Sequence, residues 1–294
     1  MHAISTSSLG IGTLTIVIAL MLLIVLLPFC LMTYYSLTDL SFSLPGRTGH
    51  FIGLSNFKQA LTDSRFWESL LLTVQFAILA IPIELVIGLI VSLALPIRSP
   101  CGRLLIPLLV VPLLFSGIAV GLVWRLLLHG DYGLLVYYLR AFGLIGNRSL
   151  LGSPTSAFAC VLLVDIWQWT PFCAMVLLAA RTGIARSLYN SAKLDGAGPL
   201  RTFFDITLPG LRHALLVCLL FRTTDCLREF DKIWALTNGG PGTRTELISV
   251  YLFKASFEHG DQAYGSALSL LIYIVVIACT NTFLWIVWKK QNAS

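Results

Sequence analysis

Six apolar segments, each long enough to cross a lipid bilayer, constrain this chain more than any other feature. A helix needs roughly 20 apolar residues to span about 30 Å of hydrocarbon. Only 12% of the residues are charged, whereas a soluble domain carries about 25%. We therefore expect an all-α polytopic membrane protein, in contact with membrane lipid, whose residues 1–294 form a single transmembrane domain. The six predicted transmembrane helices cover approximately 11–35, 69–95, 104–128, 157–180, 213–235 and 264–288. Prolines inside several spans, among them Pro107 and Pro112, indicate kinked helices.

Positive charges are denser in one set of the segments between these spans. That set comprises residues 1–10, 96–103, 181–212 and 289–294, and the other set comprises 36–68, 129–156 and 236–263. Lys and Arg accumulate on the cytoplasmic side of membrane proteins, so the bias predicts that both termini are cytoplasmic. The net charge of +6 has the same explanation, because anionic headgroups attract basic residues. No basic soluble face is visible, so a nucleic-acid partner is not expected.

The sequence contains no pattern typical of catalysis or of metal binding. Its seven cysteines include no C-x-x-C pair, and its five histidines include no pair at metal-ligand spacing. A G-x-S-x-G motif is absent, which makes a membrane-embedded enzyme the less favoured alternative. A Walker A motif is absent as well, so energy from ATP must come from a partner. A secondary carrier or channel that works without an ATPase is a further alternative, although no convincing internal repeat supports it.

The segment between the fourth and fifth spans has a definite local pattern. Residues 187–194 have helical spacing, and Gly196 is suited to the left-handed conformation that ends a helix. The Gly198-Pro199 pair can begin a second helix, because Pro is tolerated in a first helical turn. We expect Leu208-Pro209 to stop this second helix before the fifth span. The small residues around the turn allow close approach of another chain, so the segment is predicted to be a docking element.

This segment, "NSAKLDGAGPLRTFFDITLP", resembles the EAA loop of ABC importer permeases. The matching positions are Asp195, Gly196, Ala197, Ile206, Leu208 and Pro209. The resemblance implies a type I ABC importer permease fold, in which the coupling loop, residues 181–212, docks a cytoplasmic ATPase. The implied ATPase-coupling residues are Leu188, Tyr189, Asn190, Ser191, Ala192, Lys193, Asp195, Gly196, Ala197, Phe203 and Phe204. Asn190 stands where the family has Glu, so the charge-assisted part of that contact is absent.

Other stretches resemble the carbohydrate-type branch of the same family. "LTNGGPGTRTELISVYLFKASFEHGDQAYGSALS", from Leu236 to Ser269, resembles the loop before its last helix, and "FIGLSNFKQALTDSRFWESLLLTVQFAI" resembles its first outer loop and second helix. The resemblance implies import of a sugar or sugar derivative across a bacterial cytoplasmic (inner) membrane. It also implies a second permease subunit, an ATPase dimer that holds ATP and Mg²⁺, and an extracytoplasmic solute-binding protein.

Polar residues inside the apolar spans are the candidates for the solute pathway, because ionisable groups at membrane depth usually face an interior or a cavity. They are Gln75, Glu84, Asp165, Trp167, Gln168, Arg222, Asp225 and Arg228. Arg222, Asp225 and Arg228 share roughly one helix face. Two interpretations remain open for them. They form a structural ion-pair ladder, within the helix or to the partner subunit, or one arginine faces the pathway and favours an anionic solute.

Overall fold

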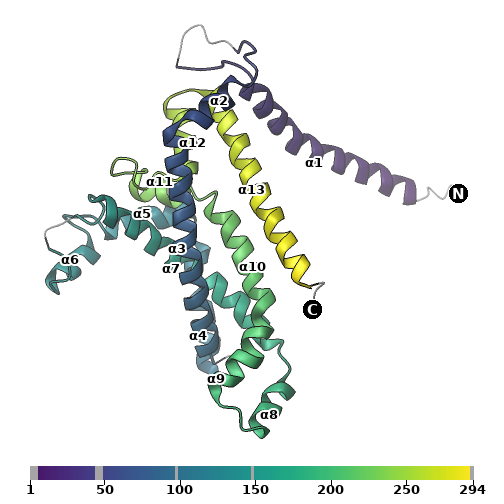
Figure 1. The fold of residues 1–294 in the computed structure, drawn as a ribbon, viewed down its shortest axis with the longest axis vertical. Coiled ribbons are helices and arrows are strands. Elements are labelled where there is room, and N and C mark those ends of the chain that lie inside the picture. Colours follow the sequence, from purple (N-terminus) through teal and green to yellow (C-terminus); the bar gives the residue numbers. More distant parts are fainter. Residues whose placement is uncertain (1–5, 44–48, 97–98, 147–148, 292–294) are drawn as a thin grey trace. The chain divides into compact units, whose positions relative to one another are not determined.

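The computed structural model describes residues 6–43, 49–96, 99–146 and 149–291. These residues are helical apart from turns and an isolated bridge between Thr38 and Phe51 (Figure 1). They divide into two compact units, which we describe separately. Unit 1 comprises Met1–Ser64 and Leu252–Val275, and unit 2 comprises Arg65–Tyr251 and Val276–Ser294.

Unit 1 contains α1 (Thr6–Ser36), α2 (Ser55–Thr62) and the beginning of α13 (Gln262–Gln291). The buried amide of Asn56 on α2 donates to the carbonyl oxygens of Ser36 and Thr38, at 2.9 and 2.8 Å. The Tyr264 hydroxyl donates to Asp63 at 2.7 Å. These bonds satisfy the backbone where α1 ends and attach the polar loop to the start of α13.

Unit 2 is built around three long helices, α3 (Ser64–Ala94), α7 (Pro154–Thr182) and α10 (Leu208–Cys226). Its shorter helices are α4 (Pro100–Val110), α5 (Gly117–Leu127), α6 (Leu134–Ala141), α8 (Arg186–Leu194), α9 (Pro199–Thr202) and α11 (Asp231–Thr237), and α12 (Ile248–Phe253) begins in it. A glycine permits close contact between α3 and α7, because a Cβ at Gly88 would lie 2.8 Å from Cys173 Cβ.

Five described helices are long and apolar enough to cross a membrane, and a bent pair supplies a sixth crossing if it counts as one span. The predicted span 104–128 is wrong as a single helix. It is α4, a 3₁₀ turn over Val111–Leu114 and α5, bent by 95°. Pro112 lies in the turn, and Ser116 caps α5 by accepting from the Ala119 amide at 3.3 Å. Together they end one helix and begin another.

The predicted fifth span, 213–235, is also corrected at both ends. Leu208-Pro209 does not stop a helix, because α9, a π-helical turn over Phe203–Thr207 and α10 follow one another without interruption. Pro209 lies in the first turn of α10, where its missing N–H is tolerated. At the other end α10 stops at Cys226, and α11 begins separately at Asp231.

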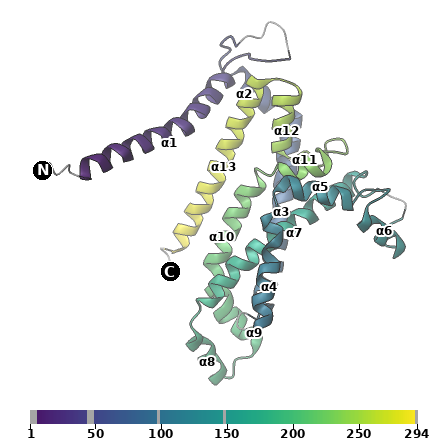
Figure 2. The ribbon, with the colours of Figure 1, turned by 180° about the vertical axis from the view of Figure 1, so that it is seen from behind.

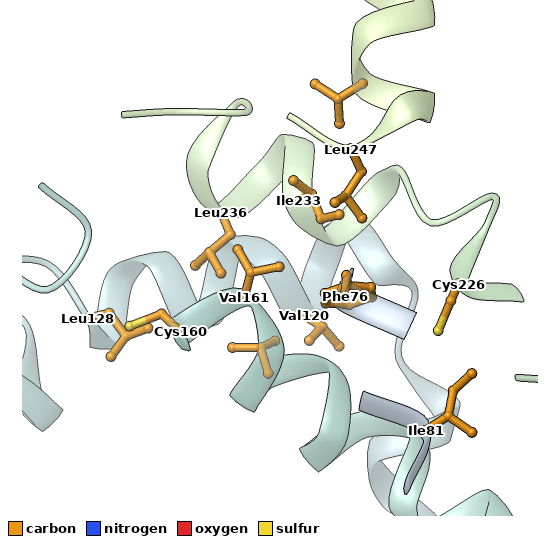
Figure 3. Packing of buried hydrophobic residues seen from close by; sticks show 12 residues of the cluster. Phe76, Ile81, Val120, Leu128, Cys160, Val161, Cys226, Ile233, Leu236 and Leu247 are labelled. Carbon is orange, nitrogen blue, oxygen red and sulfur yellow. The ribbon is translucent and has the colours of Figure 1, made fainter. Parts of the chain in front are cut away.

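The core of unit 2 lies where α3, α5, α7 and α11 meet. Figure 3 shows Leu236 beside Val161 there, and Ile233 beside Leu247. The closest approach is between α5 and α11, because a Cβ at Gly121 would lie 2.6 Å from Ala235 Cβ and 2.7 Å from the Lys232 carbonyl oxygen. In both ribbon views α8 and α9 lie at the end of unit 2 opposite α11 (Figures 1 and 2).

Candidate functional site

A network of charged side chains joins four helices inside unit 2. Arg222 of α10 donates through Nε and Nη2 to the two oxygens of Glu84 on α3, at 2.6 and 2.8 Å. Its Nη2 also donates to Asp165 of α7 at 2.6 Å, and its Nη1 donates to Asp225 one turn along α10. We call this set, completed by Glu229 and Lys232 below, the ion network.

Lys232 of α11 extends the ion network. Its Nζ lies 2.5 Å from the second oxygen of Asp165 and 2.9 Å from Glu229, which precedes α11. Asp165 therefore accepts from two cations, Arg222 and Lys232. The Arg222, Glu84 and Asp165 side chains are at most 1% exposed. A buried charge is stable only when it is paired and hydrogen-bonded, and the geometry meets that requirement.

A cavity of about 400 Å³ adjoins the ion network. Asp225, Glu229 and Lys232 contribute to its wall, together with the rings of Trp169, Phe172 and Phe230. The Arg222 guanidinium lies 4.8 Å from the centre of a Trp169 ring, so this indole packs against the network.

Two buried polar atoms beside this cavity have no hydrogen-bond partner among the described residues. They are Gln168 Oε1 and Trp169 Nε1. The other end of the Gln168 amide donates to the Phe115 carbonyl oxygen at 3.1 Å, in the bend between α4 and α5. A buried polar atom without a partner is unfavourable, so an acceptor and a donor are available there for a ligand. Aromatic faces beside polar groups are suited to a sugar ring and its hydroxyl groups.

The structure brings together only part of the predicted pathway set. Glu84, Asp165, Arg222 and Asp225 form the ion network, and Gln168 lies at the cavity. Arg228 lines the cavity but stays outside the network, and its Nε donates to the Thr224 carbonyl oxygen at 3.3 Å. Arg222 therefore pairs with Asp225 within α10 and also with Glu84 of α3 and Asp165 of α7.

Two predicted pathway residues lie elsewhere. Gln75 is exposed on α3. Trp167 lines an apolar cavity of about 490 Å³ and packs edge-on against Trp124, with 5.5 Å between ring centres. Sequence reasoning missed Lys232 and Glu229, although the charged stretch from Arg228 to Lys232 was a visible signal inside an apolar span.

The coupling segment has the predicted helix, turn and helix. Gly196 has φ +72°, the left-handed conformation that suits glycine. The Gly196 amide donates to the Lys193 carbonyl oxygen at 3.2 Å, and the Ala197 amide donates to that of Ala192 at 2.9 Å. These two bonds form a complete Schellman motif at the end of α8. Pro199 then begins α9.

Most of the predicted coupling residues are accessible. Leu188, Asn190, Ser191, Lys193, Asp195, Gly196 and Phe204 are exposed, Tyr189, Ala197 and Phe203 are half-buried, and Ala192 is buried. Leu194 and Leu200 add apolar surface, at 89% and 74% exposed. A cavity of about 280 Å³ between α8 and the π-helical turn is lined by Ser191, Ala192, Asp195 and Ala197, among others. Exposed apolar side chains around a small concave site are typical of a docking surface.

Known proteins that resemble this chain are transport components. The family model described as "Binding-protein-dependent transport system inner membrane component" matches residues 58–290. A probable ABC transporter permease protein of Sinorhizobium fredii is 33% identical over 94% of this chain and 89% of its own length. The trehalose/maltose transport system permease protein MalF of Thermococcus litoralis is 36% identical over 80% and 79%. The sulfoquinovosyl glycerol transport system permease protein SmoG of Agrobacterium fabrum is 35% identical over 92% and 88%.

Solved structures agree on the fold. A chain of a bacterial ABC transporter involved in the import of the acidic polysaccharide alginate superposes with a TM-score of 0.80, at 21% identity, over 96% of each chain. A chain of the alginate transporter in complex with an alginate pentasaccharide-bound periplasmic protein also has a TM-score of 0.80, at 19% identity, over 95% of this chain and 94% of that one. The expected ABC importer permease fold is therefore confirmed, and this chain is a multi-pass membrane protein that belongs to the family of binding-protein-dependent transport system inner membrane components.

Proposed function

We propose that this chain is the permease subunit of an ATP-driven importer for a sugar or sugar derivative. It forms half of the translocation path and docks a separate ATPase through residues 181–212. One observation carries the proposal: α9, the second helix of the exposed coupling segment, continues without a break into α10, the helix that bears Arg222. Movement at the docking surface can therefore reach the membrane interior through continuous helix.

The proposal includes partners and an orientation. Residues 1–294 act as one permease domain in a bacterial cytoplasmic membrane, with both termini in the cytoplasm. A second permease subunit completes the path, an ATPase dimer binds ATP and Mg²⁺, and an extracytoplasmic protein delivers the solute. The positive charge of the 181–212 segment supports this orientation.

The sugar class is supported by the relatives and by the cavity beside the ion network. One relative is named for trehalose and maltose, and the solved neighbours for the polysaccharide alginate. The cavity offers aromatic faces and the unpartnered polar atoms of Gln168 and Trp169. Arg228 is the cation that we assign to an anionic solute, because Arg222 is enclosed by Glu84, Asp165 and Asp225.

Copurification with the neighbouring gene products tests the proposal. We expect an ATPase to copurify with the wild-type chain and its hydrolysis to rise with solute and binding protein. Gly196→Asp should weaken both properties, because it places a charged side chain in the middle of the exposed turn. Gly143→Asp is the matched control, since Gly143 also has positive φ and open space around it but lies after α6. Uptake by the chain alone, without an ATPase, would instead establish a secondary carrier.

A further inference from the structure

A second cavity, of about 900 Å³, lies behind the coupling segment. It is a partly open cavity that lies where the end of α3, the start of α4, the end of α7, α8 and the π-helical turn converge. Leu93 and Pro96 line one side of it, and Arg186 and Tyr189 of α8 line another. Its lining includes none of the predicted pathway residues, and Tyr189 is the one predicted coupling residue in it.

The wall of this cavity is basic and rich in hydroxyl groups. Arg181 and Arg186 contribute two positive charges, and four hydroxyl-bearing residues line the same space: Ser99, Thr182, Tyr189 and Thr207. Among the described residues, none that lines the cavity carries a carboxylate. The nearest acidic side chain of the π-helical turn, Asp205, is paired with Arg201 at 3.4 Å. Two arginines without a facing carboxylate favour an anionic ligand.

Arg181 is held in a defined position with donors to spare. Its Nη1 donates to the carbonyl oxygen of Ser92 and, at 3.0 Å, to that of Leu93. Both carbonyl groups lie in the last turn of α3, where the helix supplies no further amide to bond them. A guanidinium has five N–H donors, so the edge formed by Nε and Nη2 keeps three. That edge has no recorded hydrogen bond to the described residues, and it is suited to bidentate contact with a phosphate.

The start of α8 adds positive potential to the cavity. α8, nine residues long, begins at Arg186, and its N-cap residue Ala185 makes no side-chain capping bond. The N-terminus of a helix carries partial positive charge, and its first amides need partners. The Tyr189 hydroxyl lies 3.1 Å from Thr207 Oγ1, which places a pair of hydroxyl groups on the same wall.

We propose that this cavity binds the phosphate of an anionic phospholipid headgroup, with Arg181 and Arg186 as its cationic contacts. The apolar side chains of Leu93 and Ile184 share the wall, which fits an amphipathic phosphate ester better than a free ion. Basic pockets between membrane helices on the cytoplasmic side bind such headgroups. A bound lipid would link α8 to the ends of α3 and α7. This proposal rests on the proposed function in one respect, which is that the cavity lies on the cytoplasmic side of the membrane.

Native mass spectrometry of the complex, purified with its co-encoded subunits, measures the retained lipid. The probes are phosphatidylglycerol and, as the zwitterionic comparison, phosphatidylcholine. We expect the wild type to retain phosphatidylglycerol preferentially and Arg186→Gln to reduce that preference about fivefold, the effect of one surface cation near a headgroup. Arg186→Lys should keep most of it. Arg186 is exposed, so these variants are expected to fold.

Arg201→Gln is the matched control, because Arg201 is an exposed arginine of α9 that does not line this cavity. Equal retention by the wild type and Arg186→Gln, or an equal loss in Arg201→Gln, would overturn the proposal. Displacement of phosphatidylglycerol by millimolar inorganic phosphate would overturn the lipid assignment in favour of free phosphate. An Arg186→Gln protein that loses the ATPase but keeps wild-type lipid retention would assign the cavity to a protein contact. The lipid readout needs no transport, so it can fail while the proposed function stands.

Discussion

Replacing Arg222 by Gln should destabilise the protein strongly, because Arg222 is the centre of the ion network. It makes four hydrogen bonds to the carboxylates of Glu84, Asp165 and Asp225. Hydrogen bonds to charged groups contribute about 1.5–3 kcal/mol each, so the gross loss is about 6–12 kcal/mol. The freed carboxylates can take up protons, which limits the net loss. We therefore expect about 3–5 kcal/mol, the usual effect of removing one partner from a buried ion pair.

A thiol-reactive dye measures this loss in detergent. Cys160, Cys173, Cys218 and Cys226 are buried free cysteines, whereas Cys30 and Cys279 are exposed, so the rise in labelling above that of the exposed thiols reports the temperature at which the bundle opens. The expected destabilisation should lower the unfolding midpoint by roughly 10 °C. Arg222→Lys should be intermediate, because it keeps the charge but loses the two-oxygen contact with Glu84.

Arg201→Gln is the control for charge removal on the same helical path. Its pair with Asp205 is exposed, and exposed pairs contribute about 0–1 kcal/mol. We expect its unfolding midpoint to stay close to that of the wild type. An Arg222→Gln protein that unfolds at the wild-type temperature and changes only its solute preference would refute the reasoning, and Arg222 would then belong to the solute path.

Two further outcomes follow from the geometry of α5, α11 and the cavity. Gly121→Ala should lower the same unfolding midpoint, because the new Cβ would lie 2.7 Å from the Lys232 carbonyl oxygen, a backbone atom that cannot rotate away. Gly146→Ala is the control, since Gly146 has open space around it. Equal unfolding midpoints for the two variants would contradict the close packing of α5 and α11. Arg228→Gln should reduce uptake of an anionic sugar about tenfold, the effect expected from loss of one charge-assisted hydrogen bond, and should leave uptake of a neutral sugar unchanged. Equal effects on the two solutes in transport assays would show that Arg228 does not select for charge.

Local chemistry made parts of this fold predictable. The end of α8 follows from Gly196, whose left-handed conformation closes a Schellman motif with neighbours in the same short segment. The starts of α9 and α10 were harder to distinguish, because a proline in a first turn and a proline that ends a helix look alike in sequence. Pro199 was interpreted correctly and Pro209 was not, since the π-helical turn that carries the chain past residue 207 has no comparable sequence signal.

Other features depend on contacts between distant parts of the chain. Membrane depth marks Glu84 and Arg222 as interior residues, but 138 positions separate them and no local rule pairs them. The break between α4 and α5 was hidden by apolar residues on both sides of Pro112 and Ser116. A cap residue inside an apolar run is weak evidence alone. In the structure the break leaves the Phe115 carbonyl oxygen without a helical partner, and the side-chain amide of Gln168, 53 residues away, donates to it.

α9 of the coupling segment and Arg222 of the ion network lie on one continuous helical path, and this has a mechanical consequence under the proposed function. From Pro199 to Arg222 the path is about 35 Å long at 1.5 Å per residue. At its far end Arg222 is bound to Glu84 of α3 and Asp165 of α7. Rotation of α10 alone would separate buried charges, at about 3–5 kcal/mol for a broken pair. Movement of α3, α7 and α10 together breaks none of these pairs, so a displacement of α9 is transmitted to the three helices as one body.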